Sequence, residues 1–227
     1  MMIQALIKAI AQLNDKAIQK TLLSSIAASM AVFVALWLII GFLLTSTTFF
    51  EWGWLDTIID FMGGLATLVI TWFLFPGIVT VIIGLFLDDV AKAVEAKHYP
   101  GLPPASGSSV GETIIASLRF VVMLVILNVF MLLFLIIPPV FPFVFYSVNG
   151  YLLGREYFDL VSLRRMNPVH ARELRKQHQG TLFVFGICIA LLLTIPVVNL
   201  LTPIVATAAM IHLFEKYRHG LPEPSQA

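Results

Sequence analysis

The sequence predicts an all-α integral membrane protein with two spanning helices, two re-entrant (half-penetrating) helical hairpins and amphipathic interfacial helices. Hydrophobic residues make up 59% of the 227 and charged residues only 12%, whereas about a quarter of a soluble domain is charged. Several apolar runs reach the roughly 20 residues that a spanning helix needs, and none shows the alternation of a membrane barrel strand. The basic residues also gather on segments that can share one side of a membrane.

The first element is predicted to be an interfacial helix over residues 1–23. Ile3, Leu6, Ile7 and Ile10 recur at helical spacing, which makes the segment amphipathic. It lacks the continuous apolar core and the cleavage site of a signal peptide, so we expect it to be retained.

Two spanning helices are predicted next, at residues 24–44 and 61–86. Each is long enough, at 1.5 Å per residue, to cross a hydrocarbon core of roughly 30 Å. Glycines and a Pro-Gly step should kink the second helix without ending it. The loop between them, residues 45–60, carries acidic residues but no Lys or Arg, so it is expected outside.

Residues 88–99 predict a short amphipathic helix, followed by a loop rich in Pro, Gly and Ser. The next helix should start at Val110 or Gly111. Glu112 then falls in its first turn, where the helix dipole favours an acid.

Residues 120–153 and 181–214 are apolar segments of 34 residues, each broken by proline. Basic residues flank both, and six of the chain's 14 Lys and Arg fall in residues 149–176. Each segment should therefore enter and leave on the cytoplasmic face. Two full crossings need about 60 Å of helix, whereas 34 residues supply about 51 Å. We therefore predict two hairpins that turn within the membrane, a cytoplasmic tail at 215–227, and both termini in the cytoplasm.

The proline breaks suggest where an anion could bind. Pro142 should stand near the start of one helix, and Thr202 and Pro203 resemble the N-cap and first position of another. A helix N-terminus inside a membrane favours an anion, although the prolines could equally serve only to shape tight turns. Arg119, at the mouth of the first hairpin and about two turns after Glu112, could guide an anion or extend to the interface.

Several functions lack their sequence patterns. We find no phosphate-cradling glycine loop, no nucleophile motif and no metal-ligand spacing among the five histidines. The sequence therefore predicts no enzyme, no cofactor and no metal. The arginine cluster fits a positive-inside anchor better than a nucleic-acid site.

Two stretches carry a family resemblance. Residues 85–101, LFLDDVAKAVEAKHYPG, and residues 149–165, NGYLLGREYFDLVSLRR, resemble the CysZ-type sulfate permeases and the eukaryotic etoposide-induced membrane protein that shares their domain. The second stretch includes Arg155 and the pair Arg164 and Arg165. The resemblance covers essentially the whole chain, and it implies an oligomeric inner-membrane protein of bacteria that admits sulfate for cysteine biosynthesis.

One family mark is absent. Many members carry a Gly-Leu-Arg sulfate-binding motif before the first spanning helix, where this chain has residues 15–20, DKAIQK. Lys16 or Lys20 could supply the charge, but not the planar fork of arginine, and both also suit anchors of an interfacial helix. The candidate anion-binding residues are Lys16, Lys20, Glu112, Arg119, Arg155, Arg164, Arg165 and Thr202.

The predicted function is therefore a channel-like anion permease, with sulfate as the substrate. Its partners would be sulfate or a related oxyanion, the lipid bilayer and further copies of the chain, with no nucleic acid. The alternative is a membrane structural or assembly factor of the same domain family without transport activity.

Overall fold

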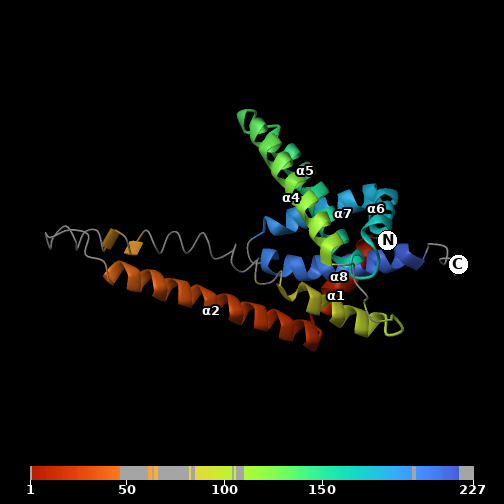
Figure 1. The fold of residues 1–227 in the computed structure, drawn as a ribbon, viewed down its shortest axis with the longest axis horizontal. Coiled ribbons are helices and arrows are strands. Elements are labelled where there is room, and N and C mark those ends of the chain that lie inside the picture. Colours follow the sequence, from red (N-terminus) through yellow and green to blue (C-terminus); the bar gives the residue numbers. More distant parts are fainter. Residues whose placement is uncertain are drawn as a thin grey trace. The chain divides into compact units, whose positions relative to one another are not determined.

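The computed structural model describes residues 2–46, 61–62, 64–65, 82, 85–103, 105, 110–195 and 198–219 (Figure 1). Every regular element within these ranges is helical, which confirms the predicted all-α class. The chain forms two compact units, residues 1–14 with 90–227, and residues 15–89. The predicted loop at 45–60 and most of the predicted helix at 61–86 lie outside the described residues.

The unit of residues 15–89 contains one long described helix, α2 (Lys16–Ser46). The carbonyl of Asp15 accepts a hydrogen bond from the N–H of Gln19 at 2.8 Å, which places Asp15 at the start of the helix. Aspartate is favoured at that position. Helix α2 therefore begins inside the predicted interfacial segment and runs without a break through the predicted crossing at 24–44.

The polar side chains within α2 are satisfied by the helix itself. The hydroxyls of Ser25 and Ser29, both buried, donate to the carbonyls of Leu22 and Ser25 at 2.8 and 2.7 Å. Such bonds leave no unpaired group in an apolar surrounding. Large apolar side chains farther along α2, including Trp37, Leu38 and Phe42, are exposed.

The other unit begins with α1 (Met2–Gln12), which ends in a turn where the N–H of Leu13 donates to the carbonyl of Ile10. Helix α1 packs on α8 (Val198–His219). Its buried side chains are small or polar, whereas Ile3, Ile7 and Ile10 are more than half exposed. An exposed stripe of isoleucines is what a helix lying on an apolar surface would present.

The segment predicted as the first re-entrant hairpin folds into two helices joined by a turn. Helix α4 (Val110–Leu132) continues as the 3-10 helix η1 (Leu133–Ile136), and α5 (Phe141–Ser162) returns and contacts both (Figure 1). The turn contains Pro138 and Pro139, and Pro142 lies in the first turn of α5 as predicted. Proline fits there because the first N–H groups of a helix have no partner within it.

Helix α7 (Gln179–Leu193) packs along α5, and the two helices touch through glycines. A Cβ atom on Gly186 would meet the backbone of Gly150 and Gly154, and a Cβ on Gly154 would meet the carbonyl of Leu182. Gly150 and Gly154 lie one turn apart on α5, a small-residue spacing that lets membrane helices approach closely. The backbones of α5 and α7 are therefore in direct contact.

Helix α6 (Pro168–Gln177) connects α5 to α7 and is bent by 87° from α7 at His178. The side chain of Asn167 accepts a hydrogen bond from the N–H of His170 at 2.9 Å, and Pro168 follows in the first turn. This Asn-Pro pair fixes the start of the helix. Arg175 and Lys176 occupy its last turn, where the helix dipole favours cations.

The segment predicted as the second re-entrant hairpin contains α7 and α8, which contact each other. The prediction that Thr202 caps a helix starting at Pro203 is wrong. Helix α8 begins at Val198, Pro203 lies inside it, and the Thr202 hydroxyl donates to the carbonyl of Val198 at 2.8 Å. Every residue from Thr202 to Glu215 is buried, and packing of this kind outweighs the one hydrogen bond that proline removes. Pro196 lies outside the described residues.

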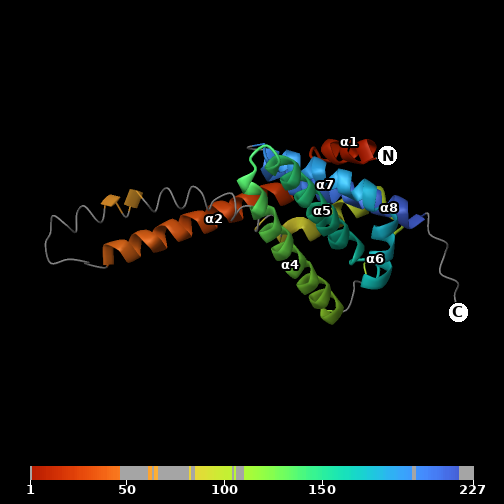
Figure 2. The ribbon, with the colours of Figure 1, turned by 90° about the horizontal axis from the view of Figure 1, so that it is seen from above.

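Three described helices are long and apolar enough to cross a membrane, at Ile18–Ile39, Leu118–Ile136 and Val198–His219. A fourth is possible if the bent pair of α6 and α7 forms one span. The chain is therefore a multi-pass membrane protein by length and composition. Figure 2 shows the same helices from above.

Candidate functional site

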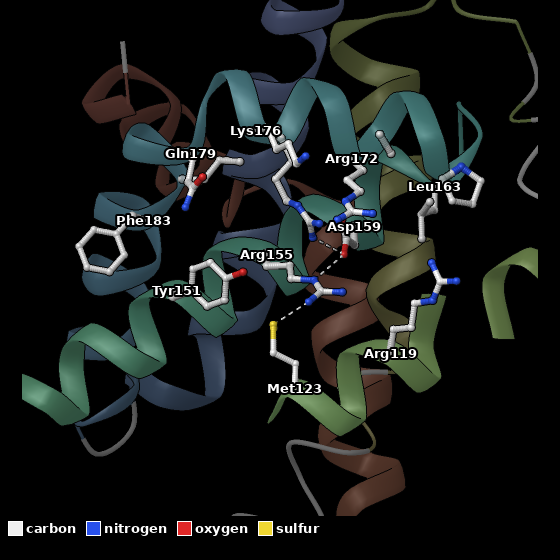
Figure 3. A pocket seen from close by; sticks show the side chains of 14 residues that line it. Arg119, Met123, Tyr151, Arg155, Asp159, Leu163, Arg172, Lys176, Gln179 and Phe183 are labelled. Atoms are coloured by element: carbon white, nitrogen blue, oxygen red, sulfur yellow. Dashed lines mark hydrogen bonds and ion pairs between the residues drawn. The ribbon is translucent and has the colours of Figure 1, made fainter. Parts of the chain in front are cut away.

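A cavity of about 400 Å³ lies among α4, α5, α6 and α7, within the unit of residues 1–14 and 90–227. Its volume falls in the range of small-molecule sites. Figure 3 shows its lining, in which basic side chains from three helices converge. The polar and charged residues of the lining are Arg119, Tyr151, Arg155, Asp159, Arg172, Arg175, Lys176 and Gln179.

Local structure explains this convergence. Arg155 directly follows Gly154, the residue at which α5 touches α7, so close packing of these helices fixes its position. Arg172, Arg175 and Lys176 are three and four residues apart on α6 and therefore share one face. The contacts of α4 with α5 and α6 bring Arg119 to the opposite side of the cavity.

Among the described residues of the lining, Asp159 is the only acid, and it pairs with two arginines. Its Oδ2 atom accepts from Nε of Arg155 at 3.3 Å and from a terminal guanidinium nitrogen of Arg175 at 2.8 Å. Arg155 also donates to the sulfur of Met123 at 2.9 Å and lies over the ring of Phe120, 5.1 Å from its centroid. Both arginine side chains are less than one fifth exposed.

The three other cations of the cavity have a different environment. Arg119, Arg172 and Lys176 are exposed and form no ion pair with any acid in the part of the chain that the structure describes. Among the described lining residues, five cations thus face one carboxylate, which gives this part of the cavity a net positive charge. The potential of such a concave surface attracts anions.

Burial affects the charges inside the cavity. It raises the pKa of the Asp159 carboxyl above its ordinary value of 3.8, against the opposing effects of Arg175 and Arg155. Burial also lowers the pKa of the Arg175 guanidinium. Both shifts reflect the loss of water around these groups, and charges in such surroundings interact more strongly than in bulk water.

The arrangement suits a small oxyanion. Guanidinium groups present parallel N–H donors that match two oxygens of a tetrahedral anion. In the described ranges, no group of three His, Cys, Asp or Glu side chains could hold a metal ion.

The structure brings together two of the predicted site residues, Arg119 and Arg155, at this cavity. Arg164 and Arg165 lie elsewhere and bind Glu95, with the shortest nitrogen-to-oxygen distance of 2.6 Å from Arg165. Arg165 also donates to the carbonyl of Pro103 at 2.9 Å. These arginines thus join the end of α5 to the segment around residues 95–103, beside a second cavity of about 340 Å³.

The remaining predicted residues are not among the residues that line this cavity. Thr202 is buried with its hydroxyl bonded within α8. Lys16 and Lys20 are exposed on α2, in the unit of residues 15–89. Glu112 lies in α4, but its side chain is outside the described part of the structure.

Sequence reasoning did not assign Asp159, Tyr151 or the three basic residues of α6 to a site. The spacing of Arg172, Arg175 and Lys176 on one helical face was a usable signal, but it was assigned to membrane anchoring. Asp159 lies one helical turn after Arg155, so their pairing could also have been predicted. The approach of Arg119 is a tertiary contact that no local pattern predicts.

The fold and the cavity define a class: an all-helical, multi-pass membrane protein with a basic, anion-attracting pocket. A family model described as Sulfate transporter CysZ/Etoposide-induced protein 2.4 matches residues 5–203. The chain belongs to this family, which confirms the resemblance seen in the sequence. A comparison with curated proteins finds no match.

Proposed function

We propose that this protein is a channel-like permease that carries sulfate, or a related oxyanion, across the inner membrane of a bacterium for cysteine biosynthesis. The family supports sulfate as the substrate. The observation that carries the proposal is the excess of five cations over one acid among the described residues that line a cavity between α4, α5, α6 and α7. The pocket would hold the anion at the cytoplasmic end of its path.

The charge distribution supports this orientation. The basic side chains of the pocket come mainly from residues 149–176, which hold six of the chain's 14 Lys and Arg. Segments so rich in basic residues are retained on the cytoplasmic side of membranes. Two spanning helices, two half-penetrating hairpins and an oligomeric assembly remain part of the proposal.

A chain that only organises other membrane proteins would have no need for a partly buried Arg-Asp-Arg cluster beside three exposed cations that have no acidic partner in the described structure. Taking such charged groups partly out of water costs desolvation, and ion pairs contribute little to stability. The cluster is better explained by ligand binding.

Uptake of radiolabelled sulfate into proteoliposomes tests the function. Arg119→Gln and Arg172→Gln each remove one exposed pocket cation that has no acidic partner in the described structure, so folding should be unaffected. Each variant should lower uptake at limiting sulfate by about threefold to tenfold, since exposed charges are partly screened. Lys216→Gln removes an exposed cation of α8 that does not line the pocket, and it should transport normally.

Two results would contradict the proposal. Uptake by the unaltered protein no greater than by empty vesicles, with other oxyanions also inert, would favour a structural or assembly role. Equal uptake by all three variants would show that the pocket takes no part in transport.

A further inference from the structure

Asp159 occupies an unexpected place for a negatively charged side chain. The other charged residues of the described cavity lining are all cationic, and Asp159 accepts from both of its arginine partners through the same oxygen, Oδ2. Arg155 on α5 and Arg175 on α6 are thereby held together by one carboxylate. Figure 3 shows Asp159 beside Arg155 in the cavity lining.

This carboxylate competes with any anion that enters. The donors of Arg155 and Arg175 that point to Asp159 are not available to a ligand while the ion pairs persist. An anion in the cavity would also be repelled by Asp159, and this repulsion doubles for a doubly charged ligand. The ion pairs with Asp159 do not involve Arg119, Arg172 or Lys176. These three side chains can therefore make the first contacts with an entering anion.

We propose that Asp159 is an internal counter-ion of the pocket: it holds Arg155 and Arg175 while the pocket is empty, and a dianionic oxyanion displaces it from them. This inference rests on the proposed function and identifies a residue that sets anion affinity there. A permeation site must bind strongly enough to admit its ion and weakly enough to release it. A built-in competitor lowers affinity without removing the cations that attract the anion.

A purely structural role for Asp159 predicts the opposite effect. If the carboxylate only held α6 against α5, its removal would let the side chains of Arg155 and Arg175 move apart and would weaken anion binding. The sign of the change in affinity therefore separates the two roles.

The experiment measures binding of sulfate and of methyl sulfate, a monoanion, to the purified full-length protein by calorimetry. Asp159→Asn keeps the shape of the side chain and removes its charge. We expect affinity to rise about threefold for the monoanion and, because the electrostatic energy doubles with ligand charge, about tenfold for sulfate. Glu156→Gln is the matched control, since Glu156 is the neighbouring acid on α5 that does not line the cavity, and sulfate affinity should be unchanged.

The outcomes separate this inference from the proposed function. Unaltered or weaker sulfate binding by Asp159→Asn, with weakened binding by Arg119→Gln, would overturn the counter-ion role and leave the pocket as the anion site. Absence of sulfate binding by the unaltered protein would instead overturn the proposed function.

If Asp159→Asn does not fold, the unaltered protein carries the test, because acid protonates the same carboxyl. The charged or titratable groups that line the cavity around Asp159 are Tyr151 and Arg155 on α5, Arg119 on α4, and Arg172, Arg175 and Lys176 on α6; α7 contributes none. Burial already raises the pKa of the Asp159 carboxyl above its ordinary value, so acidification adds a proton there and sulfate affinity should rise as the pH falls. Sulfate affinity that stays constant down to the lowest pH at which the protein remains folded would overturn the counter-ion role.

Discussion

The carboxyl of Asp159 should take up a proton when the pocket takes up an anion. Its pKa is already raised above the ordinary value by burial, despite Arg175 and Arg155. A bound dianion draws these arginines away and adds negative charge nearby, and both changes raise the pKa further. Since the bound state then holds the proton more tightly than the empty state, anion binding and proton binding must strengthen each other.

This linkage predicts net proton uptake on sulfate binding. Calorimetric titrations in buffers with different ionisation enthalpies should give sulfate-binding enthalpies that depend on the buffer. Proton uptake should be largest where the pH lies between the pKa of Asp159 in the empty state and its pKa in the bound state. At higher pH both states are ionised, and at lower pH both are protonated, so the effect should fade on either side. Asp159→Asn should show no buffer dependence, and an equal dependence in that variant would refute the assignment to Asp159.

At the scale of single residues, the sequence identifies which side chains are charged but not where the fold places them. Arg119 was predicted as a candidate because it lies at the mouth of a hairpin, and the structure places it in the pocket lining. Arg164 and Arg165 were candidates by charge and family pattern, but they bind Glu95. Which basic residue meets an acid and which stays open depends on contacts between residues far apart in the chain.

At the scale of helices, the glycine contact between α5 and α7 decides the shape of the pocket. Gly150 and Gly154 on α5 meet Gly186 on α7. Residues beside this contact line the cavity: Arg155 on α5, and Gln179, Leu182 and Phe183 on α7. A side chain at the contact would push the helices apart and displace the pocket lining.

Gly186→Ala should therefore destabilise the protein strongly. A Cβ there would overlap backbone atoms of α5, which cannot rotate out of the way as a side chain can. Overpacking of this kind costs about 1–3 kcal/mol or more. Gly180→Ala on the same helix is the control, because its Cβ would meet nothing within 4 Å and alanine favours helix. Thermal unfolding in detergent should show a lower Tm for Gly186→Ala alone; equal Tm values would contradict the backbone contact.

Helix boundaries were predictable where a residue has one dominant local role. Pro138 and Pro139 mark the turn of the first hairpin, and Pro142 lies at the start of α5, as the sequence indicated. The predicted helix start at Thr202 and Pro203 is wrong, although a Thr-Pro pair is a favourable start for a helix. Their place inside α8 depends on burial by other helices, which is not a property of the local sequence.

At the scale of the whole chain, the helical class and the two hairpins followed from composition and proline placement. Length alone does not establish how deep the hairpins reach, because Leu118–Ile136 is itself long enough to cross a membrane. The argument for a half-penetrating first hairpin therefore depends on the distribution of basic residues, which flank both of its ends.

Cysteine labelling tests this topology. In a background of Cys188→Ala, single cysteines at exposed positions in the two breaks, Pro139→Cys and Thr194→Cys, should resist an impermeant maleimide added from the periplasmic side. Val169→Cys, exposed in the basic segment, should react only in inverted vesicles. Ready periplasmic labelling at either break would mean that the corresponding helices cross the whole bilayer.

The backbone contact between α5 and α7 also limits how the cavity can change its width. At Gly154 and Gly186 the two backbones meet directly, so this part of the contact contains no side chain that could rearrange, whereas Gly150 faces the side chain of Ile187. In the proposed permeation, the cavity would therefore widen through α4 or α6, which contact α5 through side chains such as Met123 and Arg175. The flexible thioether of Met123 and the ion pair of Arg175 with Asp159 are contacts that can adjust as the cavity widens.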